Sequence, residues 1–153
     1  MKQQQGFTLI ELIVVIVILG ILAATALPKF VNLGSSARQA SLNAAQGSVQ
    51  SASNMFYAAA LAKGMSPGAG GTVTIEGTAY TVATNNLYPK GTDIAGLAGL
   101  AAGNYTITPG SPTTTISVNG AGTPANCQIT YTEPVSSAVP PSITTQDATL
   151  SGC

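Results

Sequence analysis

Apolar and polar residues divide the chain into three stretches with different patterns. The first, residues 7–27, is apolar almost throughout and reads F-T-L-I-E-L-I-V-V-I-V-I-L-G-I-L-A-A-T-A-L. Because a helix rises about 1.5 Å per residue, this stretch predicts a helix of about 30 Å, which is long enough to cross a bilayer. Glu11 interrupts the run, and a charge near the centre of a membrane helix costs at least about 2.5 kcal/mol.

The second stretch, residues 28–63, is amphipathic. Its apolar residues recur at helical spacing in two sets, which together cover a broad arc of a helix. Such an arc requires a partner surface, most simply a sheet packed against it. One helix is therefore predicted from Phe7 to about Lys63, with Gly64 as its stop. The two sets are Phe30, Leu33, Ala37, Ala40 and Ala44, and Leu42, Ala45, Val49, Ala52, Phe56 and Ala59.

Two residues weaken this long helix. Pro28 lacks a backbone N–H and its ring clashes with the preceding turn, so it should kink or open the helix. Gly20 is a second soft point, because glycine is a poor helix former. We therefore expect the helix to yield first between Gly20 and Pro28.

The third stretch begins at Gly64 and is rich in Gly, Thr, Ser, Pro and Val, a composition typical of short strands joined by turns. Because the connections are too short for helical crossovers, the strands should pair antiparallel. The predicted fold is α+β, with a long N-terminal helix, half membrane-spanning and half amphipathic, packed on a small antiparallel β-sheet. The predicted elements are a hairpin of residues 72–75 and 79–83 around Glu76-Gly77, a short helix at 92–102, and strands at 104–108, 114–118 and 128–132.

Composition and charge narrow the possible functions. Only 7% of the residues are charged, the net charge is zero, and there is no His. A nucleic-acid partner is not expected, because binding one requires a basic surface. Without His there is no ordinary Ser-His-Asp or Cys-His arrangement, and the acids in the third stretch lack the spacing of a metal site or an acid–base pair. The sequence therefore predicts no enzyme, no cofactor and no metal site.

The first six residues, M-K-Q-Q-Q-G, are polar and carry one positive charge. An ordinary secretory signal has its small-residue cleavage site after the apolar part. Here the small residue, Gly6, precedes the apolar stretch instead. A cut after Gly6 would remove residues 1–6 as a leader and leave the apolar segment on the mature protein.

With that cut, G-F-T-L-I-E resembles the prepilin-peptidase recognition site of type IV pilins and pseudopilins. The similarity continues through L-I-V-V-I-V-I-L-G-I-L-A-A-T-A-L-P-K-F, with Gly20 and Pro28 in the family's positions, and covers about the first 40 residues. The stretch P-K-F-V-N-L-G-S-S-A-R, together with C-Q-I-T-Y-T-E and a terminal Cys, is most similar to the mannose-sensitive haemagglutinin (MSHA) branch of major pilins.

The resemblance implies roles for three residues. Prepilin peptidase would cut between Gly6 and Phe7, the new Phe7 amine would be methylated, and Glu11 would neutralise the Phe7 amine of a neighbouring subunit. Phe7 and Glu11 stand at positions i and i+4, so they share one helix face. Two unit charges about 4 Å apart are worth about 4 kcal/mol at an effective dielectric constant of about 20. The alternative is that Glu11 merely marks the membrane edge.

Cys127 and Cys153 are the two cysteines, and an even number behind an export signal indicates one disulfide in an oxidising compartment. Two free, buried thiols in a cytosolic protein are the alternative. A bond would close a loop of about 26 residues, contribute about 3 kcal/mol, and fasten a strand-poor tail, residues 133–152, to the strand containing Cys127. The resemblance makes residues 134–150 of that tail a candidate for contacts with subunits or partners. The alternative is that the disulfide serves only as a covalent staple.

The resemblance also implies a type IV pilin fold and a location. The precursor would sit in the bacterial inner membrane, assemble with itself on a platform into an extracellular helical filament, and serve attachment to surface glycans or host cells, or motility. The parts would be leader 1–6, filament core 7–27, amphipathic helix 28–63, and a globular domain 64–153 with disulfide-bounded tail 127–153. The alternatives are a pseudopilin of a type II secretion system and a membrane-anchored, monomeric adhesion module. The terminal cysteine pair favours the pilin.

Overall fold

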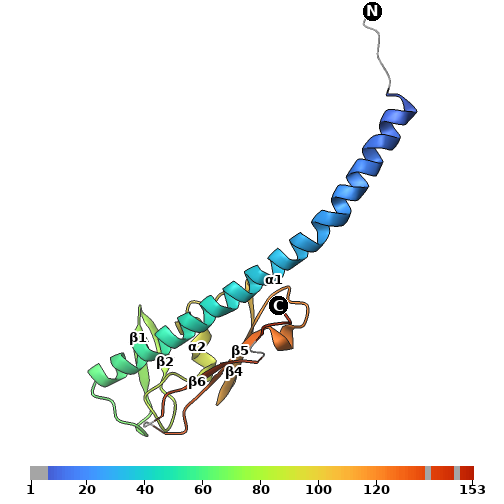
Figure 1. Cartoon of the computed structure of the whole chain (residues 1–153). Coiled ribbons are helices and arrows are strands. Elements are labelled where there is room, and N and C mark those ends of the chain that lie inside the picture. Colours follow the sequence, from blue (N-terminus) through green and yellow to red (C-terminus); the bar gives the residue numbers. More distant parts are fainter. Residues whose placement is uncertain (1–6, 137–138, 147–148) are drawn as a thin grey trace, which may run out of the picture. The chain divides into compact units, whose positions relative to one another are not determined.

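The computed structural model describes residues 7–136, 139–146 and 149–153, without the side chains of residues 27, 28 and 30–32 (Figure 1). The predicted leader and its cleavage residue Gly6 lie outside these residues. The chain divides into two compact units, of which the first ends at Ser36 and the second runs from Ala37 to Cys153.

Helix α1 spans Leu9–Ala62 and belongs to both units. It ends in a Schellman motif, in which the Met65 N–H bonds the Ala60 carbonyl at 3.1 Å. Gly64 supplies the left-handed residue of this motif with a φ of 69°, as its predicted role as a stop requires. The backbone stays helical through Gly20 and Pro28. Their weakness in an assembled filament therefore remains a prediction.

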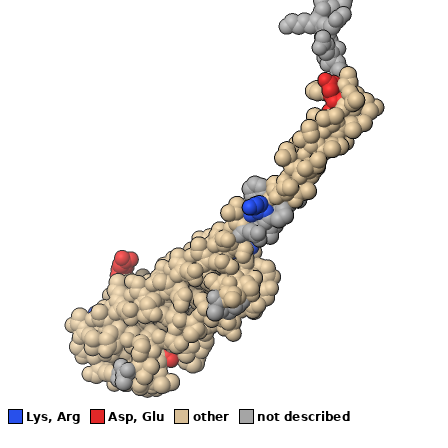
Figure 2. Space-filling model, in the orientation of Figure 1, with Lys and Arg blue, Asp and Glu red and all other residues tan. Residues whose placement is uncertain are grey.

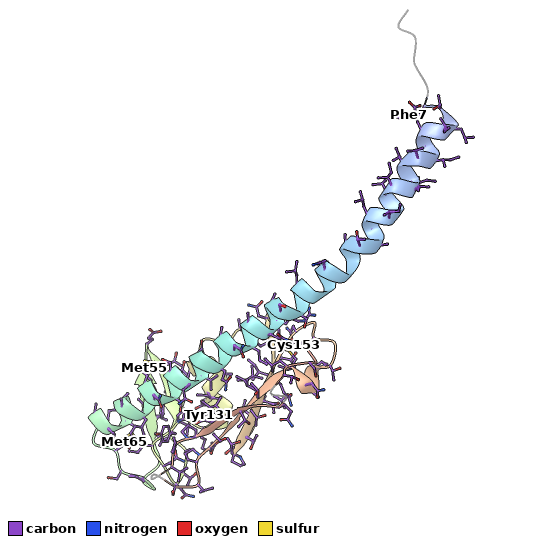
Figure 3. All side chains as sticks on the ribbon, in the orientation of Figure 1. Phe7, Met55, Met65, Tyr131 and Cys153 are labelled. Carbon is purple, nitrogen blue, oxygen red and sulfur yellow. A yellow bond between two sulfur atoms is a disulfide. The ribbon has the colours of Figure 1, made fainter. Side chains whose placement is uncertain are left out.

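In the first unit, the apolar side chains from Phe7 to Leu22 are not covered by any residue that the structure describes. The best candidate membrane span of α1 is Leu9–Ala26, with a mean hydropathy of 2.8. The large apolar side chains from Phe7 to Leu22 are each at least 47% exposed. Figure 3 shows side chains projecting from the helix along the part that follows the labelled Phe7. This much exposed apolar surface requires lipid or other protein to cover it.

The second unit contains a four-stranded antiparallel sheet in the order β3-β4-β5-β6. Side chains alternate between its two faces, as the period of two in these segments predicts. The inner face carries Tyr105, Ile107, Ile116, Ile129 and Tyr131, which pack beneath α1. The strands are β3 Tyr105–Thr108, β4 Thr113–Val118, β5 Gln128–Thr132 and β6 Ser142–Thr145.

The strand β6 corrects the prediction of a strand-poor tail. It pairs with β5 over its whole length, and Ile143 lies opposite Tyr131. The segment S-I-T-T is only four residues long and follows Pro140 and Pro141, so its local pattern is weak. Its pairing with β5 and the disulfide nearby supply the register that the sequence signal lacks.

A two-stranded sheet and a short helix complete the unit. Strand β1, Thr72–Ile75, pairs with β2, Thr78–Thr81, and confirms the predicted hairpin. Glu76 and Gly77 both have positive φ, 50° and 80°, as a type I′ turn requires. Helix α2 spans Gly91–Leu97 and is shorter than predicted. A three-residue 3₁₀ turn, η1 Pro124–Asn126, precedes β5.

The core of the second unit has two clusters, and α1 contributes to both. Figure 3 labels Tyr131 among the side chains that lie below the helix. The first cluster joins Leu42, Ala45 and Val49 of α1 to Ile94 of α2 and to Ile116, Ile129 and Tyr131 of the sheet. The second joins Phe56 and Ala60 of α1 to Val73, Val82 and Leu87 around the hairpin. The second predicted set thus meets the sheet surface, whereas the described residues of the first set are exposed, so the apolar arc is narrower than predicted. These exposed residues are Leu33, Ala37, Ala40 and Ala44.

Two carboxylates fix α2 between the two sheets. Glu133, after β5, accepts a hydrogen bond from the Gly91 N–H at the start of α2, with an O···N distance of 2.7 Å. Asp93 accepts one from the Thr81 N–H of β2 at 2.6 Å. These acids looked dispersed in the sequence, and in the fold they hold backbone groups of neighbouring elements.

Candidate functional site

The start of α1 is a capping box made by Thr8 and Glu11. Glu11 Oε2 accepts hydrogen bonds from the Thr8 backbone N–H at 2.9 Å and from the Thr8 hydroxyl at 2.6 Å. The Thr8 Oγ1 in turn accepts a long hydrogen bond, 3.4 Å, from the Glu11 N–H. This reciprocal pair satisfies donors that a helix N-terminus otherwise leaves free.

The capping box gives Glu11 a role within its own chain that sequence reasoning missed. The signal was present, because T-L-I-E follows the T-x-x-E pattern of a capping box. A carboxylate in the first turn also interacts favourably with the helix dipole. The bonds from Thr8 occupy only Oε2, and Glu11 Oε1 accepts no hydrogen bond from the residues that the structure describes. One oxygen thus holds the helix end while the other is open.

Phe7 is the first residue that the structure describes. Because α1 begins at Leu9, Phe7 lies outside the helix, so the prediction that it shares a helix face with Glu11 is wrong for this chain. The Phe7 side chain is 88% exposed, and Figure 3 labels it just before α1 begins. In the uncut chain the Phe7 nitrogen is an amide, so it offers no charge to Glu11. A cut after Gly6 would convert that nitrogen to an amine. Within residues 7–136, 139–146 and 149–153, no ion pair involves Glu11.

A second group of contacts holds the tail. Cys127 and Cys153 form the disulfide that the cysteine count indicated, and both are buried. Three polar side chains of α1 donate hydrogen bonds to tail carbonyls, and we call them the tail clamp. Arg38 Nε donates to the Cys153 oxygen. Gln39 Nε2 donates to the Leu150 oxygen at 3.2 Å, and Gln46 Nε2 donates to the Ile143 oxygen at 3.4 Å.

The predicted contact segment of the tail, residues 134–150, is partly exposed. Val135 is 85% exposed and Val139 is 48% exposed, whereas Leu150 is buried. Two parts of it, residues 137–138 and 147–148, are outside the described structure. Exposed apolar side chains fit a role in contacts, which remains a prediction.

Charges are few over the view in Figure 2. In the part of the chain that the structure describes, no group of three His, Cys, Asp or Glu residues could hold a metal ion. The groove between α1 and α2 is lined by small and apolar residues such as Gly47, Ser48, Met55 and Leu97. Its chemistry suits contact with protein rather than acid–base work.

Comparison with known proteins identifies a family motif in the N-terminal segment. Residues 1–27 match the family model described as the prokaryotic N-terminal methylation motif. The chain carries this methylation motif. The type IV narrow pilus major component PilA5 of Thermus thermophilus is 56% identical over 48 residues. That match covers 31% of this chain and 41% of the relative's length. No solved structure matches the chain significantly.

The motif and the similarity to PilA5 together support the type IV pilin family. The α+β architecture is consistent with the pilin fold, with a long apolar N-terminal helix followed by a helix and antiparallel sheets. The motif includes the predicted processing residues Gly6 and Phe7 as well as Glu11 and Gly20. The roles of these residues are taken up below as proposals.

Proposed function

We propose that this chain is the structural subunit of a type IV pilus and polymerises through its N-terminal helix. The observation that carries the proposal is the methylation motif on a helix whose apolar side chains are exposed all around. In the membrane, lipid covers this surface. In a filament, the same surface of neighbouring copies would cover it, and the second unit would remain free to fold on its own core.

Processing creates the charge that assembly uses. Prepilin peptidase cuts between Gly6 and Phe7 in the inner membrane, and the Phe7 amine is methylated. Glu11 Oε1 then pairs with the amine of a neighbouring subunit, while Oε2 keeps its bonds to Thr8. At about 4 Å and an effective dielectric constant of about 20, the pair contributes about 4 kcal/mol. The assembly platform delivers subunits, and the filament leaves the cell.

The finer assignment is a major pilin of the MSHA type that serves attachment to surface glycans or host cells and motility. The disulfide and its exposed tail support a pilin over a pseudopilin of a type II secretion system. A structural subunit needs no cofactor or catalytic residue. The membrane-anchored, monomeric adhesion module shares the helix but makes no use of a charged pair between copies.

Mass spectrometry of the purified protein and electron microscopy of expressing cells test this proposal together. The mature chain should begin at a methylated Phe7, and long extracellular filaments should disappear when the gene is deleted. A chain that keeps Met1 and lacks methylation would contradict the central proposal. Short periplasmic filaments would favour the pseudopilin, and a processed monomer would favour the adhesion module.

A further inference from the structure

Asn119 and Gly120 are the only Asn-Gly pair in the sequence, and both are exposed just after β4. In such a pair the backbone nitrogen of the glycine can reach the side-chain carbon of the asparagine, because glycine has no Cβ to obstruct the approach. Gly120 has a φ of 76°, which glycine adopts without strain. The Gly120 N–H donates no hydrogen bond to any residue that the structure describes, so this nitrogen is free to react.

The side chain of Asn119 fastens the connection between α2 and β3. Its Nδ2 donates to the Ala102 carbonyl at 3.3 Å and to the Gly103 carbonyl at 3.2 Å. Its Oδ1 accepts a hydrogen bond from the Thr106 hydroxyl at 2.7 Å. Ala102 and Gly103 lie in the exposed turn of residues 101–104. We call these three bonds of the Asn119 side chain the Asn119 latch.

Attack of the Gly120 nitrogen on Asn119 Cγ would convert this pair without an enzyme, and asparagine is a thermolabile residue because of reactions of this kind. A bond forms between Gly120 N and Asn119 Cγ, the bond from Cγ to Nδ2 breaks, and the side-chain nitrogen leaves as ammonia with the proton of the Gly120 N–H. One water molecule then opens the succinimide ring and leaves a carboxylate at position 119, on either an aspartate or an isoaspartate. The net change replaces the amide NH₂ group by a hydroxyl group, which ionises, and nothing is oxidised or reduced.

The product cannot keep the Asn119 latch closed. An amide offers N–H donors, whereas a carboxylate only accepts hydrogen bonds. An oxygen in place of Nδ2 would face the Ala102 and Gly103 carbonyl oxygens, so two hydrogen bonds would become two repulsive contacts. Arg38 lines the same pocket of about 290 Å³ as Asn119 and Gly103, so its positive charge favours the carboxylate in the pocket rather than against the turn.

We propose that Asn119 deamidates spontaneously and that the reaction releases the turn of residues 101–104 from the end of β4. This inference goes beyond the proposed function, because it concerns a single chain and needs no filament. Water is the only co-reactant, so the change accumulates with the age of each chain. Because the net charge of the whole chain is zero, each reacted chain carries an excess negative charge as well as a looser connection between α2 and β3.

The first experiment follows the conversion of each asparagine in the full chain, held in detergent micelles at mildly alkaline pH and analysed by peptide mass spectrometry. We expect Asn119 to convert, and Asn104, which lines the same pocket but precedes Tyr105, to remain unreacted. Gly120→Asn should slow the conversion at position 119 at least about tenfold, which corresponds to about 1.4 kcal/mol in the barrier, because the new Cβ obstructs the attack. Asparagine tolerates a positive φ, and a Cβ at Gly120 meets no atom within 4 Å beyond its chain neighbours, so the fold should be retained.

Two results of this experiment would overturn the inference. If Asn119 stays unreacted in the folded chain but converts after unfolding, the Asn119 latch blocks the attack, and the Asn-Gly pair serves only as a turn. If Asn104 converts as fast as Asn119, the reaction does not depend on the following glycine.

The second experiment measures the release of the turn in Asn119→Asp, which places the carboxylate of the product at position 119. The Tyr105 N–H donates to the Ala101 carbonyl at 3.2 Å, so hydrogen exchange at this amide reports on the turn. After correction for intrinsic rates, we expect exchange about tenfold faster, which corresponds to about 1.4 kcal/mol of local stability. Asn104→Asp is the matched control and should leave exchange unchanged, because it adds the same charge at the same pocket, where the Asn104 side chain bonds no residue that the structure describes.

Deamidated wild-type chains, separated from unreacted chains by anion exchange, give the same measurement without a substitution. Unchanged exchange at Tyr105 in both Asn119→Asp and the deamidated chains would overturn the release of the turn. All these results concern a single chain in micelles, so a failure here leaves the proposed function as it stands.

Discussion

At the scale of single residues, Glu11 combines two functions that would otherwise compete. Its Oε2 holds the first turn of α1 through Thr8, and its Oε1 is open to a partner. The cost of a carboxylate in an apolar helix is thus partly offset within the chain and would be offset further by a neighbouring amine. Substituting Glu11 and Thr8 separately distinguishes the assembly role from the capping role.

We predict that Glu11→Val inserts into the membrane normally but assembles poorly, because the amine of the next subunit lacks its partner. A loss of only about 1.4 kcal/mol lowers an association constant tenfold, so filament yield should fall at least about tenfold. Filaments and membrane fractions would be quantified by immunoblot. Thr25→Val is the control, because among the described residues the Thr25 hydroxyl bonds only the Leu22 and Ile21 carbonyls of its own helix. A normal yield from Glu11→Val would refute the pairing.

Thr8→Val tests the capping role alone. It keeps the carboxylate and removes the side-chain cap, which should cost about 1 kcal/mol in the first turn. Amide hydrogen exchange in detergent micelles should then be about fivefold faster over residues 9–12 and unchanged beyond the second turn. Unaltered exchange at those amides would mean that the capping box contributes nothing to the helix end.

Tyr131 makes the second unit sensitive to alkaline pH. Burial is the main cause that raises the pKa of its hydroxyl, and the Glu133 carboxylate acts in the same direction. The Tyr131 hydroxyl donates to the Pro89 carbonyl at 2.8 Å, so the neutral form is the one that fits. Since the folded state holds this proton more tightly than the unfolded state, stability should be present below about pH 10 and fall as pH rises further.

Denaturation of Tyr131→Phe in detergent measures this effect. The variant should lose about 1 kcal/mol at neutral pH, because the Pro89 carbonyl loses its donor, and should show a weaker decline above pH 10. Tyr80→Phe is the control and should keep the wild-type decline, because Tyr131 remains in place. Identical pH profiles for Tyr131→Phe and the wild type would refute the assignment.

At the scale of elements, the sequence predicts those that have a local pattern and misses those that depend on long-range contacts. The hairpin β1–β2 and the strands β3 to β5 follow from alternating residues and turn residues, which are local signals. Strand β6 and the tail clamp depend on partners far along the chain. Gln46 and Ile143, for example, are 97 residues apart, so no local pattern could indicate their bond.

The disulfide and the tail clamp both attach the tail to the rest of the second unit. We expect the disulfide to contribute more to the free energy of unfolding than any single hydrogen bond of the clamp. Under oxidising conditions Cys127→Ser should lower the free energy of unfolding by about 3 kcal/mol, because the loop closed over 26 residues is released. Gln39→Ala should cost about 1 kcal/mol, since it removes one neutral hydrogen bond. Chemical denaturation of each variant measures both, and equal stability of Cys127→Ser and the wild type would contradict the role of the disulfide.

At the scale of the whole molecule, the two units cover their apolar side chains in different ways. The first exposes its apolar side chains and depends on lipid or other copies. The second contains both core clusters, whose residues all lie between Leu42 and Cys153. A chain shortened to residues 37–153 therefore retains every described core residue and the disulfide, and loses the surface through which we propose that it polymerises.

We accordingly predict that residues 37–153 fold cooperatively and remain monomeric. Size-exclusion chromatography and thermal unfolding by circular dichroism would measure both properties. Residues 54–153 are the control, because they lack Leu42, Ala45 and Val49, which fill the first cluster from α1. Losing even one such aliphatic side chain costs about 2–5 kcal/mol, so losing the whole segment exceeds the margin of a domain of this size. Filaments formed by residues 37–153 would show that polymerisation does not need the apolar half of α1.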